Sequence, residues 1–519
     1  MGLFKSTAVV SLFTLVSRIS GFIRDMVMAG FFGVSIWTDA FIAVFRIPNF
    51  MRRLFAEGSF SMAFVPVLNE IKAKNSQAEL KVFIDRISGT LLAIVLIVWM
   101  LMELFAPQIM WLTAHKWHSS RPDVFHESVG MLHITLVYFP LITLVAFAGG
   151  ILNTHKKFAI PAATPILLNV SLIAAMFFLR DNFAIPEKSL ALGVLIAGVL
   201  QLLMQIPALL RLGLFPRFSL GFKDKQVQKV MKLMVPTLFG SSVAQINILF
   251  DTIIALWLPL AVSATILYYS DRLMEFPLGI FAIAISTVIL PTLSRQFAKD
   301  DAKGFVATMR WALNLGFFIG VPAAAGLAVL SSQVIATLFE RGAFDASSTY
   351  LTSLSLMAYM VALPAYVLNK ILLPAYYSRK DTKTPVKIGI IAMFSNMLFN
   401  LIFVWVLWYF EVVALHVGLA LASAVSAWMQ TFMLYRGLRS NAIVPQSVIQ
   451  WSVVVKIVFA SFCMVVVIAF VLSQIGLWSH MSSVWQVLAL LACIGVGMAV
   501  YFMTLWFMKV DIKAIMAHR

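Results

Sequence analysis

Charged residues are scarce in this sequence. Only 12% of its 519 residues are Asp, Glu, Lys or Arg, whereas 61% are hydrophobic, and the mean hydropathy is +0.94. A soluble domain of this composition would expose more apolar surface than water tolerates. The sequence contains repeated apolar runs of about 20 residues, long enough to cross the ~30 Å hydrocarbon core of a bilayer. It therefore predicts a polytopic membrane protein of the all-α class.

Cysteine is also rare, and no nucleotide-binding pattern is present. Cys463 and Cys493 lie in separate late apolar runs, so neither a disulfide framework nor a metal site is indicated. The sequence has no glycine-rich phosphate-binding loop either, which argues against transport powered by ATP hydrolysis in this chain. His115 and His118 lie in a polar outer loop and His416 in an apolar run, so we expect no catalytic residues.

The apolar runs predict fourteen membrane-spanning helices. Because the first is too long and too charged for a cleaved signal peptide, we interpret it as a retained helix. The predicted spans are 7–32, 36–68, 84–110, 128–153, 160–179, 189–210, 233–258, 263–294, 311–338, 349–376, 386–408, 413–435, 453–474 and 484–508.

The net charge of +17 is distributed unevenly between the loops. Every second loop, starting from the first, is nearly free of base. These loops carry only Lys116, Arg121, Arg180, Lys188 and Arg341, whereas the others are rich in Lys and Arg. The positive-inside rule then places both termini in the cytoplasm. We interpret the basic excess as a topology signal that contacts anionic membrane lipids, and we expect no nucleic-acid partner.

An internal repeat is visible in the loops. The string 65-VPVLNEIKAK-74 resembles 290-LPTLSRQFAK-299, and 152-LNTHKKFAIPAATP-165 resembles 373-LPAYYSRKDTKTP-385. The two pairs of strings are separated by nearly the same number of residues. This agreement predicts a six-helix lobe that occurs twice, at 1–215 and 216–440, followed by two extra helices within 441–519. Duplicated halves are typical of transporters that work by alternating access. Chance similarity between two loop ends is the alternative.

The first predicted helix carries charges where lipid would exclude them. In 17-SRISGFIRD-25, helical spacing places Ser17 and Arg24 on one face and Arg18 and Asp25 on the adjacent face. Placing an arginine at mid-bilayer disfavours insertion by at least ~2.5–3.5 kcal/mol. The polar stripe therefore predicts a water-accessible cavity or charged partners.

The second predicted helix has a polar face of its own. Pro48 removes a backbone donor and is expected to kink this helix. The polar face consists of Asp39, Arg46, Asn49, Arg53 and Glu57, with Arg52 beside it.

Arg272 and Glu275 form the counterpart in the second half, within 268-YYSDRLMEFPLGI-280. Arginine presents a fixed fork of donors to phosphate oxygens and stays charged at any relevant pH. We therefore predict that Arg24, Arg52 and Arg272 converge on an anionic ligand. The alternative is that the arginines pair with nearby acids and lock helices together.

Four strings identify a known family. The segments 17-SRISGFIRD-25, 38-TDAFIAVFRIPNFMRRLFAEGSFSMAFVPVL-68, 269-YSDRLMEFPLGI-280 and 375-AYYSRKDTKTPVKI-388 closely resemble the bacterial lipid II flippases, the MurJ or MviN family. That family belongs to the multidrug/oligosaccharidyl-lipid/polysaccharide exporter superfamily. The resemblance covers the whole chain.

The resemblance implies transport of lipid II, the polyprenyl-linked peptidoglycan precursor, across the cytoplasmic (inner) membrane during cell-wall synthesis. Two C-terminal helices in the family form a groove for the lipid tail, which implies that role for 453–474 and 484–508. The cell-wall synthesis machinery is a further candidate partner. Positions required in the family or lining its cavity match Arg18, Arg24, Arg52, Arg272, Asp39, Arg53 and Glu57.

Two sources of energy stay open. Asp251 is a lone acid in the seventh helix, and Asn396 and Asn400 lie on one face of the eleventh. Together they would supply oxygens to a coupling sodium ion; otherwise Asp251 is bonded within its own half. Alternatively, the membrane potential acts on the arginines, at ~2.3 kcal/mol per charge per 100 mV.

Three other functions are alternatives for such a sequence. A drug or cation antiporter of the same superfamily should line its cavity with acids and aromatics, which the arginine excess disfavours. A flippase for another polyprenyl-linked glycan is excluded by the motifs and not by composition. A membrane enzyme acting on polyprenyl phosphates would need an acid pair for magnesium or a nucleophile and base, which the sequence does not offer.

Overall fold

The computed structural model describes residues 3–54, 60–259, 262–279, 283–440, 443–444, 448–476, 478 and 481–516. Within these ranges every regular element is a helix, which confirms the predicted all-α class. Ten of the described helical segments are long and apolar enough to cross a membrane, so the chain is a multi-pass membrane protein. Each of the fourteen predicted spans coincides with one helix or with two successive helices.

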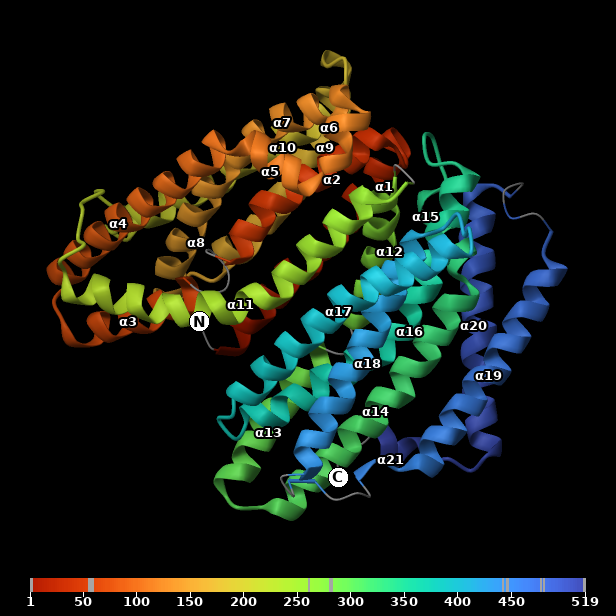
Figure 1. Ribbon diagram of the computed structural model, residues 1–519. Helices are drawn as coiled ribbons and strands as arrows, with labels where there is room; N and C mark the ends of the chain where they lie inside the picture. The colour runs from red at the N-terminus through yellow and green to blue at the C-terminus, as the bar shows by residue number, and fades with distance from the viewer. Residues whose placement is uncertain are drawn as a thin grey trace. The chain divides into compact units, whose positions relative to one another are not determined.

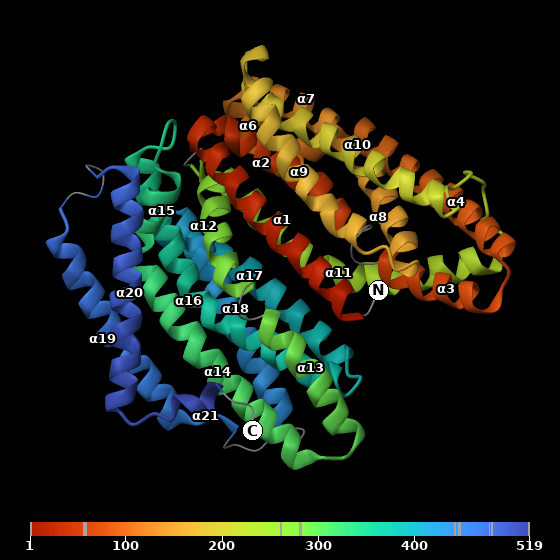
Figure 2. The same cartoon turned by 180° about the vertical axis from the view of Figure 1, so that it is seen from behind.

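The chain divides into two compact units, Met1–Ala264 and Thr265–Arg519. In the first unit, α9 packs between α1 and α10, and α8 lies against α10 (Figures 1 and 2). Its helices are α1 (Leu3–Phe32), α2 (Ile36–Met51), α3 (Ser61–Lys74), α4 (Gln77–Leu104), α5 (Ala106–Thr113), α6 (His115–Ser120), α7 (Pro122–Leu136), α8 (Tyr138–Thr154), α9 (Ala159–Phe178), the 3-10 turn η2 (Arg180–Asn182), α10 (Lys188–Arg211) and α11 (Lys225–Trp257).

The helix α2 continues in α-helical geometry through Pro48. The kink expected at Pro48 stays a prediction. Helix α2 ends at Met51, and residues 52–54 are π-helical. Such π-helical turns expose backbone groups and often mark functional positions. Arg52 therefore stands on an irregular stretch of backbone.

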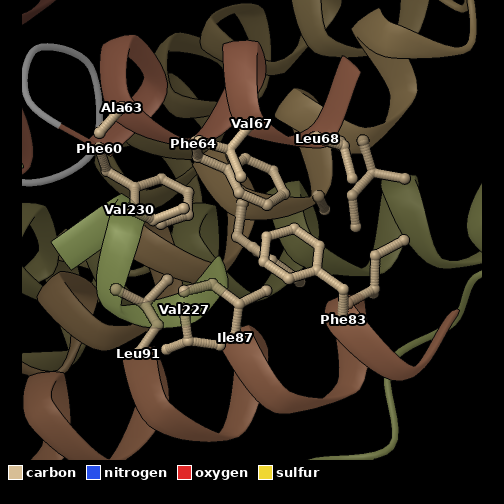
Figure 3. Close-up of a cluster of buried hydrophobic side chains, with 14 of the residues drawn as sticks. Phe60, Ala63, Phe64, Val67, Leu68, Phe83, Ile87, Leu91, Val227 and Val230 are labelled. Atoms are coloured by element: carbon tan, nitrogen blue, oxygen red, sulfur yellow. The ribbon is translucent and has the colours of Figure 1, made fainter. Parts of the chain in front are cut away.

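Helix α11 belongs to the first compact unit, although the sequence repeat assigns it to the second half. Val227 and Val230 of α11 are fully buried against Phe64 of α3 and Ile87 of α4 (Figure 3). This cluster anchors the N-terminal end of α11, which is predicted to lie on the cytoplasmic side. The lobe boundaries at 215/216 and 440/441 are predicted from the sequence repeat. They stay a prediction about which segments are duplicated, and they do not describe which helices pack together.

The linker segment, residues 212–224, fastens α11 to α4. It runs extended along α4, and its alternate backbone N–H groups find acceptors there. Arg217 N donates to Asp85 Oδ1 (2.7 Å), and Gly221 N donates to Thr90 Oγ1 (2.9 Å). Arg86 of α4 is ion-paired with Asp224 (2.7 Å). Asp224 in turn caps the N-terminus of α11, so linker and helix are held by one residue.

The second unit starts with the remainder of α12. In it, α16 packs against α14 and α18 (Figure 1). Its helices are α12 (Ser263–Pro277), α13 (Ile283–Ala298), α14 (Ala302–Val329), α15 (Ser331–Phe339), α16 (Ala346–Tyr377), α17 (Lys383–Tyr409), α18 (His416–Ser440), α19 (Trp451–Gln474), α20 (Ser483–Phe507) and α21 (Ile512–Met516).

The two C-terminal helices predicted from the sequence, α19 and α20, lie side by side and pack on α14 (Figures 1 and 2). Two polar contacts fix the pair. Tyr501 donates its hydroxyl hydrogen to the Phe318 carbonyl (2.9 Å), and Asn314 Nδ2 donates to Gln450 Oε1 (2.8 Å). In an apolar surrounding such bonds define the register between helices that apolar packing alone leaves loose.

Candidate functional site

Arg24 is buried in the C-terminal third of α1, with a relative exposure of 7%. Its Nε (3.0 Å) and Nη2 (2.6 Å) both donate to the same oxygen, Oδ1 of Asp25. Its Nη1 donates to Oδ1 of Asn169 on α9 (3.0 Å). The amide of Asn169 lies beside Gly21 of α1. The predicted polar stripe of α1 therefore faces α9 at this level.

Arg18 is placed differently from Arg24. Its side chain is exposed on α1, whereas Asp25 is buried at 2%. Asp25, predicted to share a face with Arg18, instead bonds to Arg24. Adjacent residues of a helix point about 100° apart, so this contact depends on the reach of the arginine side chain.

Asp39 is buried at 1% in the first turn of α2. Its Oδ2 accepts a hydrogen bond from the backbone N–H of Ala264 (3.4 Å), at the start of α12. A carboxylate is favoured beside helix N-termini, because the free N–H groups and the helix dipole both attract negative charge. The acid thus sits where two helices begin.

Arg46 and Arg53 both bond to α11. Arg46 Nη1 donates to the carbonyl of Ile248 (3.0 Å) and to the hydroxyl of Thr252. Arg53 Nη1 donates to Oε1 of Gln245 (3.4 Å). Arg53 follows Arg46 by seven residues, whereas its partner Gln245 precedes Thr252, the partner of Arg46, by seven residues. This is the register of two antiparallel helices that meet along one face.

Arg52 turns back on its own helix. Its Nε (3.0 Å) and Nη2 (2.7 Å) donate to Oδ1 of Asn49, one turn earlier. Both residues are partly exposed. Glu57, the last member of the predicted polar face, lies outside the described residues. The face predicted from spacing is thus divided, since Arg46 and Arg53 contact α11 whereas Arg52 pairs with Asn49.

Arg272 lies in the second unit, on α12. Its Nη1 is ion-paired with Oε2 of Glu275 (3.0 Å), and its guanidinium carbon stands 5.1 Å from the ring centre of Tyr268. Both partners are neighbours on the same helix. About a third of the Arg272 side chain and about half of the Glu275 side chain are exposed, so the pair stays accessible.

The three residues predicted to hold sodium fall in different units. Asp251 lies on α11, where Asn247 Nδ2 approaches its Oδ2 at 3.5 Å. Asn396 and Asn400 are buried on α17; Asn400 Nδ2 donates to Asn396 Oδ1 (2.9 Å), and Asn396 Nδ2 donates to Ser423 Oγ of α18 (3.2 Å). The prediction that the two asparagines lie on one face of their helix is confirmed.

The described contacts bear on the helix-locking alternative. Two of the described ion pairs, Arg24–Asp25 and Arg272–Glu275, each lie within one helix. The described arginine bonds that cross between helices go to uncharged oxygens of Asn169, Ile248, Thr252 and Gln245. Such acceptors hold the guanidinium in place without adding negative charge, whereas Asp25 balances the charge of Arg24.

Sequence reasoning missed three of these acceptors: Asn169, Gln245 and Thr252. Asn169 carried a usable signal, because it is a strongly polar amide inside the apolar segment 159-AIPAATPILLNVSLIAAMFF-178. Polar residues within membrane spans are rare and are usually functional. Gln245 and Thr252 carried no such signal, because α11 contains many residues with amide or hydroxyl groups. Only packing determines which of these residues accept a bond from an arginine.

Comparison with known proteins decides the family. The sequence pattern of the family described as "Lipid II flippase MurJ" matches residues 28–492. The chain belongs to the lipid II flippase MurJ family. A probable lipid II flippase MurJ of Haemophilus influenzae is 43% identical over 506 residues, which are 95% of this chain and 97% of that protein. The resemblance found in the motifs is thereby confirmed.

Solved structures agree with this membership. A lipid II flippase MurJ in an inward closed conformation matches with a TM-score of 0.78 and 29% identity, covering 96% of this chain and 98% of that one. An inward-facing multidrug resistance MATE transporter matches with a TM-score of 0.65 and 12% identity, covering 84% and 98%. At that identity the second match shows a shared fold alone.

Proposed function

We propose that this protein is a lipid II flippase, which moves the lipid-linked peptidoglycan precursor from the inner to the outer leaflet of the bacterial cytoplasmic membrane by alternating access. It is a transporter and not an enzyme. Membership of the MurJ family supports the substrate. The observation that carries the mechanism is the buried Arg24, held in an apolar helix by one carboxylate oxygen and one amide.

The physics of the cargo explains why such a residue is needed. Lipid II carries a diphosphate and a sugar–peptide headgroup, whose charges and hydrogen-bonding groups would be left unsatisfied in hydrocarbon. Arginine donors satisfy phosphate oxygens in pairs and cannot be deprotonated in the process. The polyprenyl tail stays in lipid, so only the headgroup requires a polar path.

The Arg24–Asp25 contact suits reversible binding. Both Arg24 nitrogens share the single oxygen Asp25 Oδ1, whereas a diphosphate offers two oxygens to the same fork. Two separate charge-assisted bonds are stronger and better directed than two donors on one acceptor atom. A phosphate therefore competes with Asp25 for Arg24, and Asp25 restores the resting arrangement when the phosphate leaves.

Transport also requires that the ligand favour one conformation over another. The ligand shifts an equilibrium between inward- and outward-open states only by its difference in affinity for them. Arg24 and Arg52 in the first unit and Arg272 in the second are the proposed contacts. We propose that these arginines bind the diphosphate with different affinity in the two states.

The experiment that tests this function is depletion of the native protein in a peptidoglycan-making bacterium, with leaflet-specific measurement of lipid II. We expect lipid II to accumulate in the inner leaflet, and the wild-type chain to restore the outer-leaflet pool. Arg24→Ala and Arg272→Ala should fail to restore it while still reaching the membrane. Lys72→Ala is the control, because its Nζ only caps the carbonyl of Thr154. Full restoration by both arginine variants contradicts the proposed role of the arginines.

We propose a sodium ion as the coupling ion, bound by Asp251, Asn396 and Asn400. Sodium prefers oxygen ligands, and these residues offer one carboxylate and two amide oxygens. In proteoliposomes, a sodium gradient should accelerate lipid II movement by the wild type and not by Asp251→Asn, whereas a potassium gradient should accelerate neither. Equal rates with and without sodium would exclude this coupling and favour the membrane potential acting on the arginines.

A further inference from the structure

Asn169 is almost completely buried in α9, with a relative exposure of 6%. Its side chain makes three hydrogen bonds to α1. Its Oδ1 accepts from Arg24 Nη1 (3.0 Å), and its Nδ2 donates to the Ser17 carbonyl (3.0 Å) and to Ser20 Oγ (2.9 Å). These contacts span two turns of α1 and end on Arg24.

The amide orientation of Asn169 is fixed by its neighbours. Exchanging its oxygen and nitrogen would place an N–H group against the donors of Arg24 and an oxygen against the Ser17 carbonyl. Only one orientation therefore satisfies all partners. The backbone carbonyl of Ser17 and the hydroxyl of Ser20 consequently determine where the amide oxygen stands, and that oxygen determines where Nη1 of Arg24 stands.

Helix α9 packs against α1, and the amide of Asn169 lies beside Gly21. An added Cβ on Gly21 would lie 3.4 Å from Nδ2 of Asn169, at van der Waals contact. The neutrality of Asn169 also matters. A neutral amide positions the guanidinium without cancelling its charge, whereas a second carboxylate would compete with a phosphate ligand as Asp25 does.

We infer that Asn169 is a positioning residue for Arg24: its amide fixes the guanidinium in the orientation that receives the diphosphate of the substrate. This inference rests on the proposed function. Asn169 itself need not touch the substrate; it acts through Arg24. Removing it takes away one of the bonds that hold the planar guanidinium, so the diphosphate must order that group more completely on binding.

The test is a double-mutant cycle on lipid II binding, measured with purified full-length protein in lipid nanodiscs. The variants are Asn169→Leu, Arg24→Ala and the double variant. We expect Asn169→Leu to weaken binding roughly tenfold or more, as for loss of a hydrogen bond to a charged group. If Asn169 acts only through Arg24, the double variant should bind no more weakly than Arg24→Ala alone.

Gln205→Leu is the matched control. Gln205 is another buried amide that joins two helices of the first unit, donating from Nε2 to the Val145 carbonyl of α8 (3.1 Å), but no contact links it to Arg24. It should leave lipid II affinity unchanged. Asn169→Ala provides a second variant that leaves space where leucine would be too bulky, and gel filtration shows which proteins remain folded.

The outcomes separate the inference from the function on which it rests. Unchanged binding by Arg24→Ala would contradict the arginine assignment itself. Weak binding by Arg24→Ala together with wild-type affinity of both Asn169 variants would overturn only the role of Asn169. Losses that add in the double variant, or an equal loss in Gln205→Leu, would show that Asn169 merely supports helix packing.

Discussion

At the scale of single residues, the arginines of α1 and α2 show how a positive charge is kept inside an apolar helix bundle. A buried guanidinium must have its donors satisfied, and the acceptors used across helices here are amides, a hydroxyl and a carbonyl. These groups stabilise the side chain and add no negative charge of their own. The carboxylate of Asp25 balances the charge of Arg24, so an anionic ligand must compete with Asp25 for that guanidinium.

Arg46 gives a prediction at this scale. Its two bonds to α11 make it a structural link as well as a candidate ligand contact. Arg46→Met should lower the free energy of unfolding by about 2–3 kcal/mol, because two acceptors on α11 lose a charged donor. Thermal unfolding in detergent measures this. Arg18→Met is the control, since Arg18 is exposed; equal destabilisation by both would contradict the link.

Asp345 gives a second, pH-dependent prediction. It caps α16 by accepting the N–H of Ser348 (2.8 Å), and the Ser348 side chain and backbone lower the pKa of this carboxyl from its ordinary 3.8. Asp345→Ala should destabilise the protein by ~1 kcal/mol at neutral pH. A carboxylate whose folded-state pKa is lowered stabilises above its unfolded pKa, and this contribution is lost as pH falls through the folded pKa.

The measurement for Asp345 is the melting temperature of the wild type and of Asp345→Ala between neutral pH and about pH 3. The difference between them should shrink only below the ordinary pKa of 3.8. Asp345→Asn serves as the control, because an asparagine retains the cap and does not titrate. A difference that stays constant over this range would refute the role of the charge.

At the scale of elements, the contact of the linker segment with α4 determines which unit α11 joins. Gly89 is required there, because a Cβ at this position would lie 2.3 Å from the Ser219 carbonyl oxygen. Gly89→Ala should therefore displace the linker segment and destabilise the protein by about 1–3 kcal/mol. Trypsin should also cut faster at Arg217 and Lys223, which are exposed within the segment.

Gly130→Ala is the matched control for the linker segment. Gly130 lies inside α7, and nothing lies within 4 Å of an added Cβ. Alanine is the better helix former, so this variant should be neutral or slightly stabilised. Trypsin cleavage of Gly89→Ala at the wild-type rate would show that the segment is not held by its contact with α4.

At the scale of the whole molecule, the uneven distribution of base predicts the orientation in the membrane. Alkaline phosphatase fused within the loop 340–345 should be active, because we expect this loop on the outer side. The same enzyme fused within the loop 299–303, or at the C-terminus, should be inactive. The paired fusions control for expression. An active C-terminal fusion would reverse the predicted orientation.

Whole-molecule organisation also shows what sequence patterns can report. The lengths of the apolar runs predicted the helical spans, because a bilayer fixes the length of any helix that crosses it. Helical periodicity predicted the polar stripes of α1 and α2, and long motifs predicted the family. In contrast, periodicity placed Arg46, Asn49 and Arg53 on one face without revealing that Asn49 would serve Arg52.

The sequence by itself thus determined the membrane class, the helix positions and which helices carry buried charge, since all of these follow from local composition and spacing. Only the tertiary structure decided that Arg24 meets Asn169, that Arg46 meets Thr252, and that α11 packs with the first unit. These contacts join residues more than a hundred positions apart. A helix pattern tells which face is polar, but the neighbour that satisfies that face is selected by packing.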